Sequence, residues 1–262
     1  MRIFIITMED PVYTLPFIKA VVDERKNDIV GIAIPKGDRL SINKKKSKIS
    51  YLFSLLLIMG LPYYIKYSVI TIFYKLKKIL NKLRLVNDPS IIGYSKKYNI
   101  PGYRIKTPNS KKFRKLLAQQ NIDVIINQSQ NIIKRELIDI PKLGIINRHN
   151  ALLPKNRGRL TPFWVLYNCE KETGVSIHFV EEGIDSGDII VQKKFNVDKK
   201  DTFNTIVKKN YTIAAKAMIE ALDKLEKGDK NYLPNEDNKA TYNSTPSLKE
   251  AWEYRKKRII VR

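Results

Sequence analysis

Short apolar runs alternate with stretches of helical periodicity along most of the chain. Continuous apolar runs of this kind are typical of strands buried on both faces of a parallel sheet. They occupy residues 2–7, 29–34, 122–126 and 144–148, with a shorter run at 103–105. Helical periodicity occupies residues 11–25, 89–98, 110–119 and 133–137. This alternation predicts an α/β domain with a mostly parallel central sheet flanked by helices.

The second half of the chain continues with further strands and helices. Predicted strands lie at 173–180 and 188–195, and predicted helices at 161–168, 202–227 and 247–257. Asp201 is expected to cap the long helix and Gly228 to end it. Asp10 is expected to cap the first helix of the chain. We therefore expect a main domain over residues 1–228 and a tail over 229–262 that contains the last short helix.

The stretch from 36 to 86 interrupts this rhythm with basic and apolar sequence. It holds twelve Lys and Arg residues and a single acid, Asp38. Residues 49–65 carry no charge, but Gly60 and Pro62 break the run, which falls short of the roughly 20 apolar residues of a spanning helix. We expect a basic helical insertion made of two amphipathic helices. Three partners for their apolar faces remain open: an anionic membrane surface, the protein core, or a second subunit in a homodimer.

The net charge of the chain is strongly positive. Lys and Arg total 49, and Asp and Glu total 26, so the formal charge is 49 − 26 = +23. This charge attracts phosphate-bearing partners or an anionic membrane, and it can also reflect a lysine-rich composition spread over the whole surface. Lysine outnumbers arginine, which favours point-charge attraction over bidentate phosphate recognition, and we expect no specific nucleic-acid partner.

Cysteine content and the first residues indicate the compartment. The single cysteine, Cys169, excludes an internal disulfide framework and a cysteine-cluster metal site. The apolar run at 2–7 is shorter than a signal-peptide core, and no small-residue cleavage site follows it. We expect a cytoplasmic protein, or one held peripherally at the inner face of the membrane.

Polar residues gather where the predicted strand at 144–148 ends. Asn147 and His149 stand at that end, and Asp185 stands in the loop before the strand at 188–195. Ligands of open α/β sheets bind at the carboxyl ends of the strands. His, Asn and Asp together can perform general acid–base chemistry and stabilise an oxyanion.

Four short motifs in this region resemble the folate-dependent formyltransferases. They read N-R-H-N-A-L-L-P at 147–154, N-R-G at 156–158, T-G-V at 173–175 and D-S-G-D-I at 185–189. The resemblance is strongest over residues 122–197 and weaker over 1–34. Ala151 stands where the family commonly has Ser before L-L-P, which affects a loop contact and leaves the catalytic positions intact.

Within that family, the chain looks most similar to the sugar-nucleotide N-formyltransferases. Residues 7–11 lack the glycine-rich phosphate loop of the glycinamide ribonucleotide formyltransferases. The number of residues after Gly228 is 262 − 228 = 34, too few for the β-rich C-terminal domain of the methionyl-tRNA formyltransferases. The stretch 241–246 is also similar to the tails of the sugar-nucleotide enzymes.

The resemblance implies a Rossmann-like formyltransferase fold without a metal. The implied donor is N10-formyltetrahydrofolate, and the implied acceptor is a primary amine, expected on a nucleotide-linked amino sugar of bacterial surface-glycan biosynthesis. The implied catalytic residues are Asn147, His149 and Asp185. The residues implied on the folate side are Leu152, Leu153, Pro154 and Gly187. Arg157 and Gly158 would contact the substrate or shape the loop.

The chemistry of these residues agrees with the resemblance. The amide of Asn147 and a protonated His149 can both donate to the oxyanion that forms when an amine attacks a formyl carbon. Asp185 would favour the charged form of the imidazole or accept the proton of the amine. Two alternatives remain open: a methionyl-tRNA formyltransferase-like enzyme, and a non-catalytic module that binds membranes or nucleic acid. The second histidine, His178, is expected to be a packed strand residue.

Overall fold

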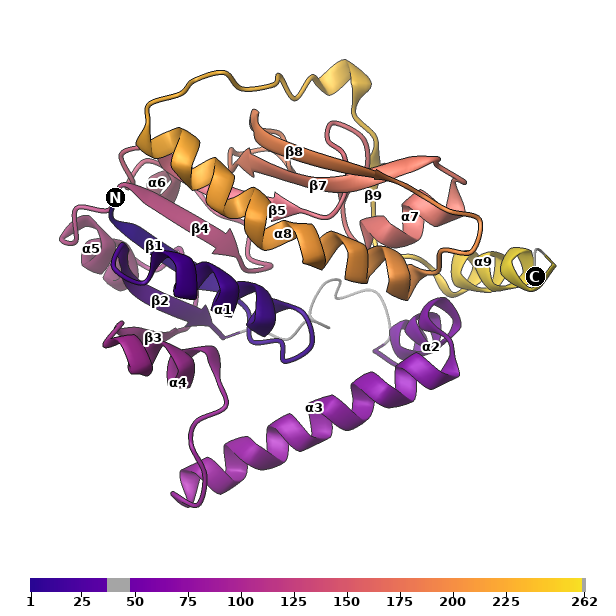
Figure 1. The fold of residues 1–262 in the computed structure, drawn as a ribbon, viewed down its shortest axis with the longest axis horizontal. Coiled ribbons are helices and arrows are strands. Elements are labelled where there is room, and N and C mark those ends of the chain that lie inside the picture. The colour runs from indigo at the N-terminus through magenta and orange to yellow at the C-terminus, as the bar shows by residue number, and fades with distance from the viewer. Residues whose placement is uncertain (37–47, 261–262) are drawn as a thin grey trace.

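The described part of the chain is built around one large sheet. The computed structural model describes residues 1–36 and 48–260, so the basic residues of the insertion at 37–47 lie outside it. The strands of the large sheet are β1 Ile3–Thr7, β2 Ile29–Pro35, β3 Gly102–Ile105, β4 Val124–Gln128, β5 Gly144–His149, β7 Glu172–Phe179 and β8 Ile189–Asn196. Their order is β3-β2-β1-β4-β5-β7-β8 (Figure 1). The strands from β3 to β5 pair in parallel, whereas β7 and β8 pair antiparallel, so the predicted mostly parallel sheet is confirmed.

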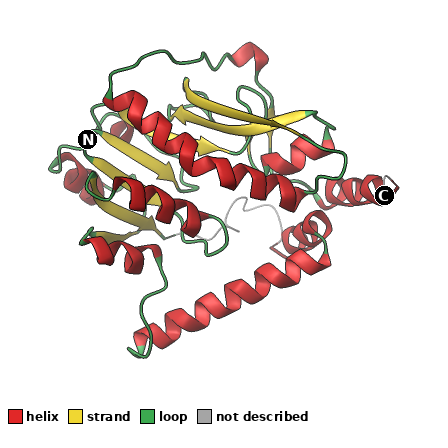
Figure 2. Cartoon of the chain, in the orientation of Figure 1, coloured by secondary structure: helices red, strands yellow, loops and turns green. Residues whose placement is uncertain are grey.

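Helices cover both faces of this sheet (Figure 2). The helices are α1 Thr14–Arg25, α2 Lys48–Met59, α3 Leu61–Lys82, α4 Ile91–Ser95, α5 Lys111–Ala118, α6 Arg135–Ile138, α7 Thr161–Tyr167, α8 Phe203–Glu226 and α9 Leu248–Ile260. Because strand side chains alternate, Ile3 and Ile5 of β1 belong to the core under α1 and α8. Phe4 and Ile6 belong to the core under α5 and α6. The predicted α/β architecture with a sheet buried on both faces is therefore confirmed.

Two helices begin later than the sequence pattern predicts. The N-cap of α1 is Tyr13 rather than Asp10, whose carboxylate accepts the backbone N–H groups of residues 12 and 13 in the preceding turn and that of Thr14, the first helical residue. The N-cap of α8 is Thr202 rather than Asp201, because Thr202 and Thr205 form a reciprocal capping box. Asp201 still contributes, since its carboxylate accepts from the Thr205 hydroxyl at 2.9 Å.

The insertion forms the two predicted helices, which meet at Gly60. Gly60 has φ +79°, a left-handed conformation that suits glycine. Helix α2 packs on the rest of the protein, where Ile58 joins a cluster with Ala251 and Tyr254 of α9. Helix α3 has no buried residue and runs apart from the sheet, from α2 at one end toward α4 at the other (Figure 1).

The tail returns to the main domain. Its short strand β9 Tyr242–Asn243 pairs in parallel with β6 Arg157–Gly158 in the loop after β5. A single bridge also joins Leu233 to Ile189 of β8. The segment after Gly228 therefore takes part in the architecture around the end of β5.

Candidate active site

The predicted catalytic residues converge at the carboxyl end of β5. Asn147 and His149 are two positions apart on this strand, so both side chains point to the same face of the sheet. The loop between β7 and β8 brings Asp185 to the same place. Oδ2 of Asp185 lies 3.4 Å from Nδ1 of His149. This location lies beside the reversal of strand order between β1 and β4, where open α/β sheets bind ligands.

His178 is a fourth member of this cluster. It is buried, as expected for a packed strand residue, yet its Nε2 lies 3.4 Å from Nδ2 of Asn147 and 3.6 Å from Oδ1 of Asp185. The reason is the antiparallel register, which sets His178 directly opposite Asn147. No pattern within a single strand reveals such a register, so sequence reasoning missed this position.

A short hydrogen bond orients each of the two β5 side chains. The amide of Gln128 donates to Oδ1 of Asn147 at 2.8 Å, which turns the Asn147 N–H groups toward the cluster. The His149 ring lies with Nε2 2.7 Å from the backbone oxygen of Asn156. Because a carbonyl only accepts, Nε2 carries a proton. If Nδ1 is protonated as well, it can donate to the Asp185 carboxylate. A charged ring therefore provides a donor both to the Asn156 carbonyl and to Asp185.

His178 is held in one neutral form. Its Nδ1 donates to the backbone oxygen of Phe179 at 2.7 Å, so Nε2 carries the lone pair and accepts from Asn147. Burial lowers the pKa of His178 to about 4, against the opposing effect of the Asp185 carboxylate. The ring is therefore uncharged at neutral pH.

Asp185 remains ionised in this buried setting. Burial alone would raise its pKa, but the neighbouring His149 and the backbone N–H of Gly158 lower the pKa below its usual value. The Gly158 N–H donates to Oδ2 at 2.9 Å. Gly158 has φ +103°, and a Cβ there would lie 2.2 Å from the backbone oxygen of Asn243. Glycine is thus required at the position that orients the carboxylate.

Gln128 is the other residue that sequence reasoning missed. It ends β4, and its Oε1 accepts from Nε of Arg148 at 2.9 Å. This second bond fixes the orientation of the Gln128 amide, so its NH₂ group must face Asn147. The available signal was the polar pair Asn127–Gln128 directly after the apolar run at 122–126.

The residues predicted on the folate side lie in loops next to the cluster. They are Leu152, Leu153, Pro154 and Gly187. Leu153 is buried; its N–H donates to Oγ of Ser176 at 3.1 Å, and its carbonyl accepts from Gln192 at 3.0 Å. A Cβ on Gly187 would lie 2.3 Å from the backbone oxygen of Phe179. These contacts fix the backbone conformation of both loops. The role of these residues in folate binding stays a prediction.

Arg157 lies inside the protein, with 0% of its surface exposed. Its guanidinium donates to O and Oδ1 of Asn235 at 2.8 and 2.9 Å, and to Asp237 and Tyr242 at 2.6 and 2.8 Å. Asn235 in turn donates to the backbone oxygen of Asp185 at 2.8 Å. These contacts favour the loop-shaping role of Arg157 over direct contact with substrate.

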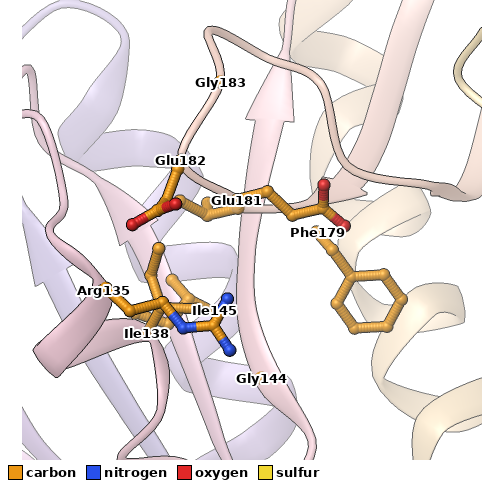
Figure 3. A pocket seen from close by; sticks show the side chains of 9 residues that line it. Arg135, Ile138, Gly144, Ile145, Phe179, Glu181, Glu182 and Gly183 are labelled. Carbon is orange, nitrogen blue, oxygen red and sulfur yellow. The ribbon is translucent and has the colours of Figure 1, made fainter.

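A cavity of about 410 Å³ lies at the opposite end of β5 from the cluster (Figure 3). Gly144, at the start of β5, and Arg135 line it. Figure 3 shows the two acids of its rim pointing apart, Glu182 toward Arg135 and Glu181 toward Phe179. This cavity is separate from the four clustered groups. Within the described residues, no group of His, Cys, Asp or Glu is arranged to hold a metal ion.

Comparison with known proteins shows the family of the chain. The sequence model of the formyl transferase family matches residues 68–222, more than half of the chain. The methionyl-tRNA formyltransferase of Kosmotoga olearia is 32% identical over 178 residues, which are 68% of this chain and 57% of that protein. The chain therefore belongs to the formyl transferase family.

Solved structures show the same fold. Glycinamide ribonucleotide transformylase 1 from Symbiobacterium toebii has a TM-score of 0.59 at 15% identity, covering 87% of this chain and 88% of its own. A sugar 3N-formyl transferase solved with dTDP and 5-N-formyl-THF has a TM-score of 0.57 at 17% identity, covering 93% of this chain and 69% of its own. The Rossmann-like formyltransferase fold is thereby confirmed. The chain spans about half the length of the curated relatives it matches.

Proposed function

We propose that this protein transfers a formyl group from N10-formyltetrahydrofolate to a primary amine. The observation that carries the proposal is how the cluster of Asn147, His149, His178 and Asp185 is held. Each member makes a contact of 2.7–2.9 Å to a neighbour outside the cluster. The contacts between members are longer, 3.4–3.6 Å. Residues outside the cluster thus fix the orientation of the four groups, while the sides of these groups that face one another remain available to a substrate.

The orientation of these groups suits acyl transfer. An amine that attacks the formyl carbon generates a tetrahedral oxyanion. The Asn147 N–H that does not donate to His178, and the Nδ1–H of a protonated His149, can donate to that oxygen. One such donor is worth about 3 kcal/mol in comparable sites. No metal is required for this stabilisation.

The proton balance follows from the same residues. The attacking amine loses a proton as the new C–N bond forms, and the ionised Asp185 carboxylate can accept it. The bond between the formyl carbon and N10 then breaks, and N10 of tetrahydrofolate takes up a proton. His149 lies beside Asp185 and can deliver that proton. His178, neutral with its lone pair on Nε2, keeps the Asn147 amide directed into the site.

For the acceptor, we propose the amino group of a nucleotide-linked amino sugar. Three features support this acceptor. The tail closes over the catalytic loop, with β9 paired to β6. The sequence of that tail at 241–246 is also similar to the tails of sugar-nucleotide enzymes. A sugar 3N-formyl transferase shares the fold over 93% of this chain.

Methionyl-tRNA is the second candidate acceptor. Two observations favour it: the curated relatives at 32% and 37% identity are named methionyl-tRNA formyltransferase, and the net charge is +23. Cytoplasmic location follows from either acceptor and is part of the proposal.

The acceptor is tested by parallel assays with the two candidate classes. The purified protein is incubated with N10-formyltetrahydrofolate and either a panel of nucleotide-linked amino sugars or methionyl-tRNA. Formylation adds about 28 Da to the acceptor, the mass of CO, as expected for acyl transfer. The proposal expects this gain on a sugar and none on the tRNA. Formylation of the tRNA alone would replace the proposed acceptor, and formylation of neither would refute the sugar assignment.

A further inference from the structure

Helix α3 presents its apolar residues to the outside of the protein. None of its residues is buried. Large apolar side chains recur every three or four positions along one face, which is called the apolar stripe below. The stripe consists of Leu61, Ile65, Val69, Ile72, Phe73, Leu76, Ile79, Leu80 and Leu83. Phe73 is 61% exposed and Ile72 56%. An exposed apolar face of this length is typical of a surface that binds a membrane or another protein.

The opposite face of α3 attaches the helix to the protein through polar groups. The Tyr74 hydroxyl and the Lys78 ammonium donate to the Glu9 carboxylate at 2.8 and 2.6 Å. Burial would raise the pKa of Glu9, but these two hydrogen bonds and the charges of Lys78 and Arg104 together lower the pKa. Tyr67 packs edge-on against Tyr13 with ring centroids 5.4 Å apart. A surface helix of a globular protein normally turns its apolar face inward, and α3 does the reverse.

Basic residues border the apolar stripe on both sides. At about 100° of rotation per residue, Lys66 and Lys77 follow one side of the stripe, and Lys75 and Lys82 follow the other. Arg84 lies two residues past the end of the helix. All five are exposed. No Asp or Glu occurs anywhere between 48 and 86. An apolar face bordered by basic residues is the pattern of a helix that lies in the interface of an anionic bilayer.

The charges disfavour a second copy of the chain on this surface. Two apolar stripes packed together would bring basic borders face to face without an acid in either segment, which is repulsive. This helix is also unsuited to crossing a bilayer. Within the described residues, no helix has the length and apolar character of a membrane span.

We propose that α3 binds the surface of an anionic phospholipid bilayer. Its axis lies in the membrane plane, its apolar stripe enters the acyl boundary, and its basic borders meet the lipid phosphates. Glu9 and Tyr13, which hold α3, belong to the segment that follows the carboxyl end of β1. The catalytic cluster also lies at the carboxyl ends of the parallel strands. Membrane binding would therefore bring this end of the sheet close to the bilayer.

The test is cosedimentation of the full chain with vesicles. One set is pure phosphatidylcholine, and the other contains 30% phosphatidylglycerol. The wild-type protein should sediment with the anionic set at low salt, be partly released at high salt, and stay in solution with the neutral set. Removing three basic residues should weaken binding by about a hundredfold, since each contributes about fivefold near an anionic surface. The test variant is Lys66→Gln/Lys75→Gln/Lys77→Gln on α3, and its control is Lys111→Gln/Lys112→Gln/Lys115→Gln on α5.

A second pair of variants tests the apolar stripe. Phe73→Ser/Leu76→Ser should abolish sedimentation, whereas Leu143→Ser/Leu248→Ser, which removes two exposed leucines elsewhere, should retain it. All these positions are exposed, so thermal unfolding should stay near the wild type. Equal binding to both vesicle sets, or equal loss in test and control variants, would overturn the proposal. A wild type that ignores both vesicle sets, and forms a dimer that Phe73→Ser/Leu76→Ser dissociates in ultracentrifugation, would assign the stripe to a second copy instead.

Discussion

Replacing Arg157 with Met should release the tail from the catalytic loop. Besides the pairing of β6 with β9, the guanidinium joins the loop after β5 to the tail through Asn235, Asp237 and Tyr242. Methionine retains an apolar stem of similar length but has no donor. The backbone and side-chain oxygens of Asn235, a residue 7% exposed, then lose their partner inside the protein.

The size of the effect follows from these partners. The ion pair with Asp237 contributes little, because that carboxylate is 83% exposed. The two bonds to Asn235 and the one to Tyr242 remain. A buried hydrogen bond from a charged donor is worth about 1.5–3 kcal/mol, and an oxygen left unpaired costs a similar amount. We expect the docking of the tail to weaken by about 3–5 kcal/mol.

Hydrogen exchange measures this docking directly. In Arg157→Met, the amides of Asn156 and Arg159, which donate to Thr241 and Asn243 of the tail, should exchange roughly a hundred- to a few thousandfold faster. The amides of β1 should keep their protection. The turnover number should fall, because Asn235 no longer holds the loop that carries Asp185, and the KM for the acceptor should change little. Arg157→Lys should show an intermediate effect, since an ammonium cannot reproduce the planar fork. Unchanged exchange at Asn156 and Arg159 together with a raised KM would refute this reasoning and assign Arg157 to substrate contact.

Two further predictions concern the positions that sequence reasoning missed. The pKa of His178 is about 4 in the folded protein and 6.5 ordinarily, so the unfolded chain takes up its proton first as the pH falls. The free energy of unfolding should therefore be unaffected by this ring above pH 6.5 and should fall by up to about 3 kcal/mol toward pH 4. Chemical unfolding at several pH values should show this fall in the wild type and a smaller one in His178→Gln. Equal dependence on pH in both proteins would contradict the prediction. Gln128→Leu should lower kcat on the order of tenfold with KM nearly unchanged, because the Asn147 amide loses its orientation. Steady-state kinetics measure this, on a variant whose circular dichroism matches the wild type. An unchanged kcat would exclude a role of Gln128 in orienting Asn147.

The sheet and its helices could be predicted from the sequence because they depend on local pattern. The apolar run at 2–7 became β1, whose side chains are buried on both faces as a continuous run requires. Gly60 separated two helices as expected. Helix starts were less accurate, because several polar residues compete to bind the first N–H groups. Thr202 prevailed over its neighbour Asp201 since Thr205 could complete the capping box.

The site was predictable where its residues follow strands, and not where it depends on register. Asn147 and His149 end β5, and their motif also carried the resemblance that pointed to Asp185. The pairing of His178 with Asn147 depends on the antiparallel alignment of β5 and β7, which no single segment encodes. The tail contacts of Arg157 join positions 78 to 85 residues apart, and the letters N-R-G do not reveal them.

The central claim is that the cluster around Asp185 performs formyl transfer. Asp185→Asn keeps the size of the side chain and an oxygen for the Gly158 N–H, but it removes the group that accepts the proton of the amine. The decisive measurement is the turnover number of this variant with N10-formyltetrahydrofolate and an acceptor that the wild type formylates. The account predicts a loss of at least about a hundredfold, with unchanged circular dichroism. Turnover close to that of the wild type would contradict it.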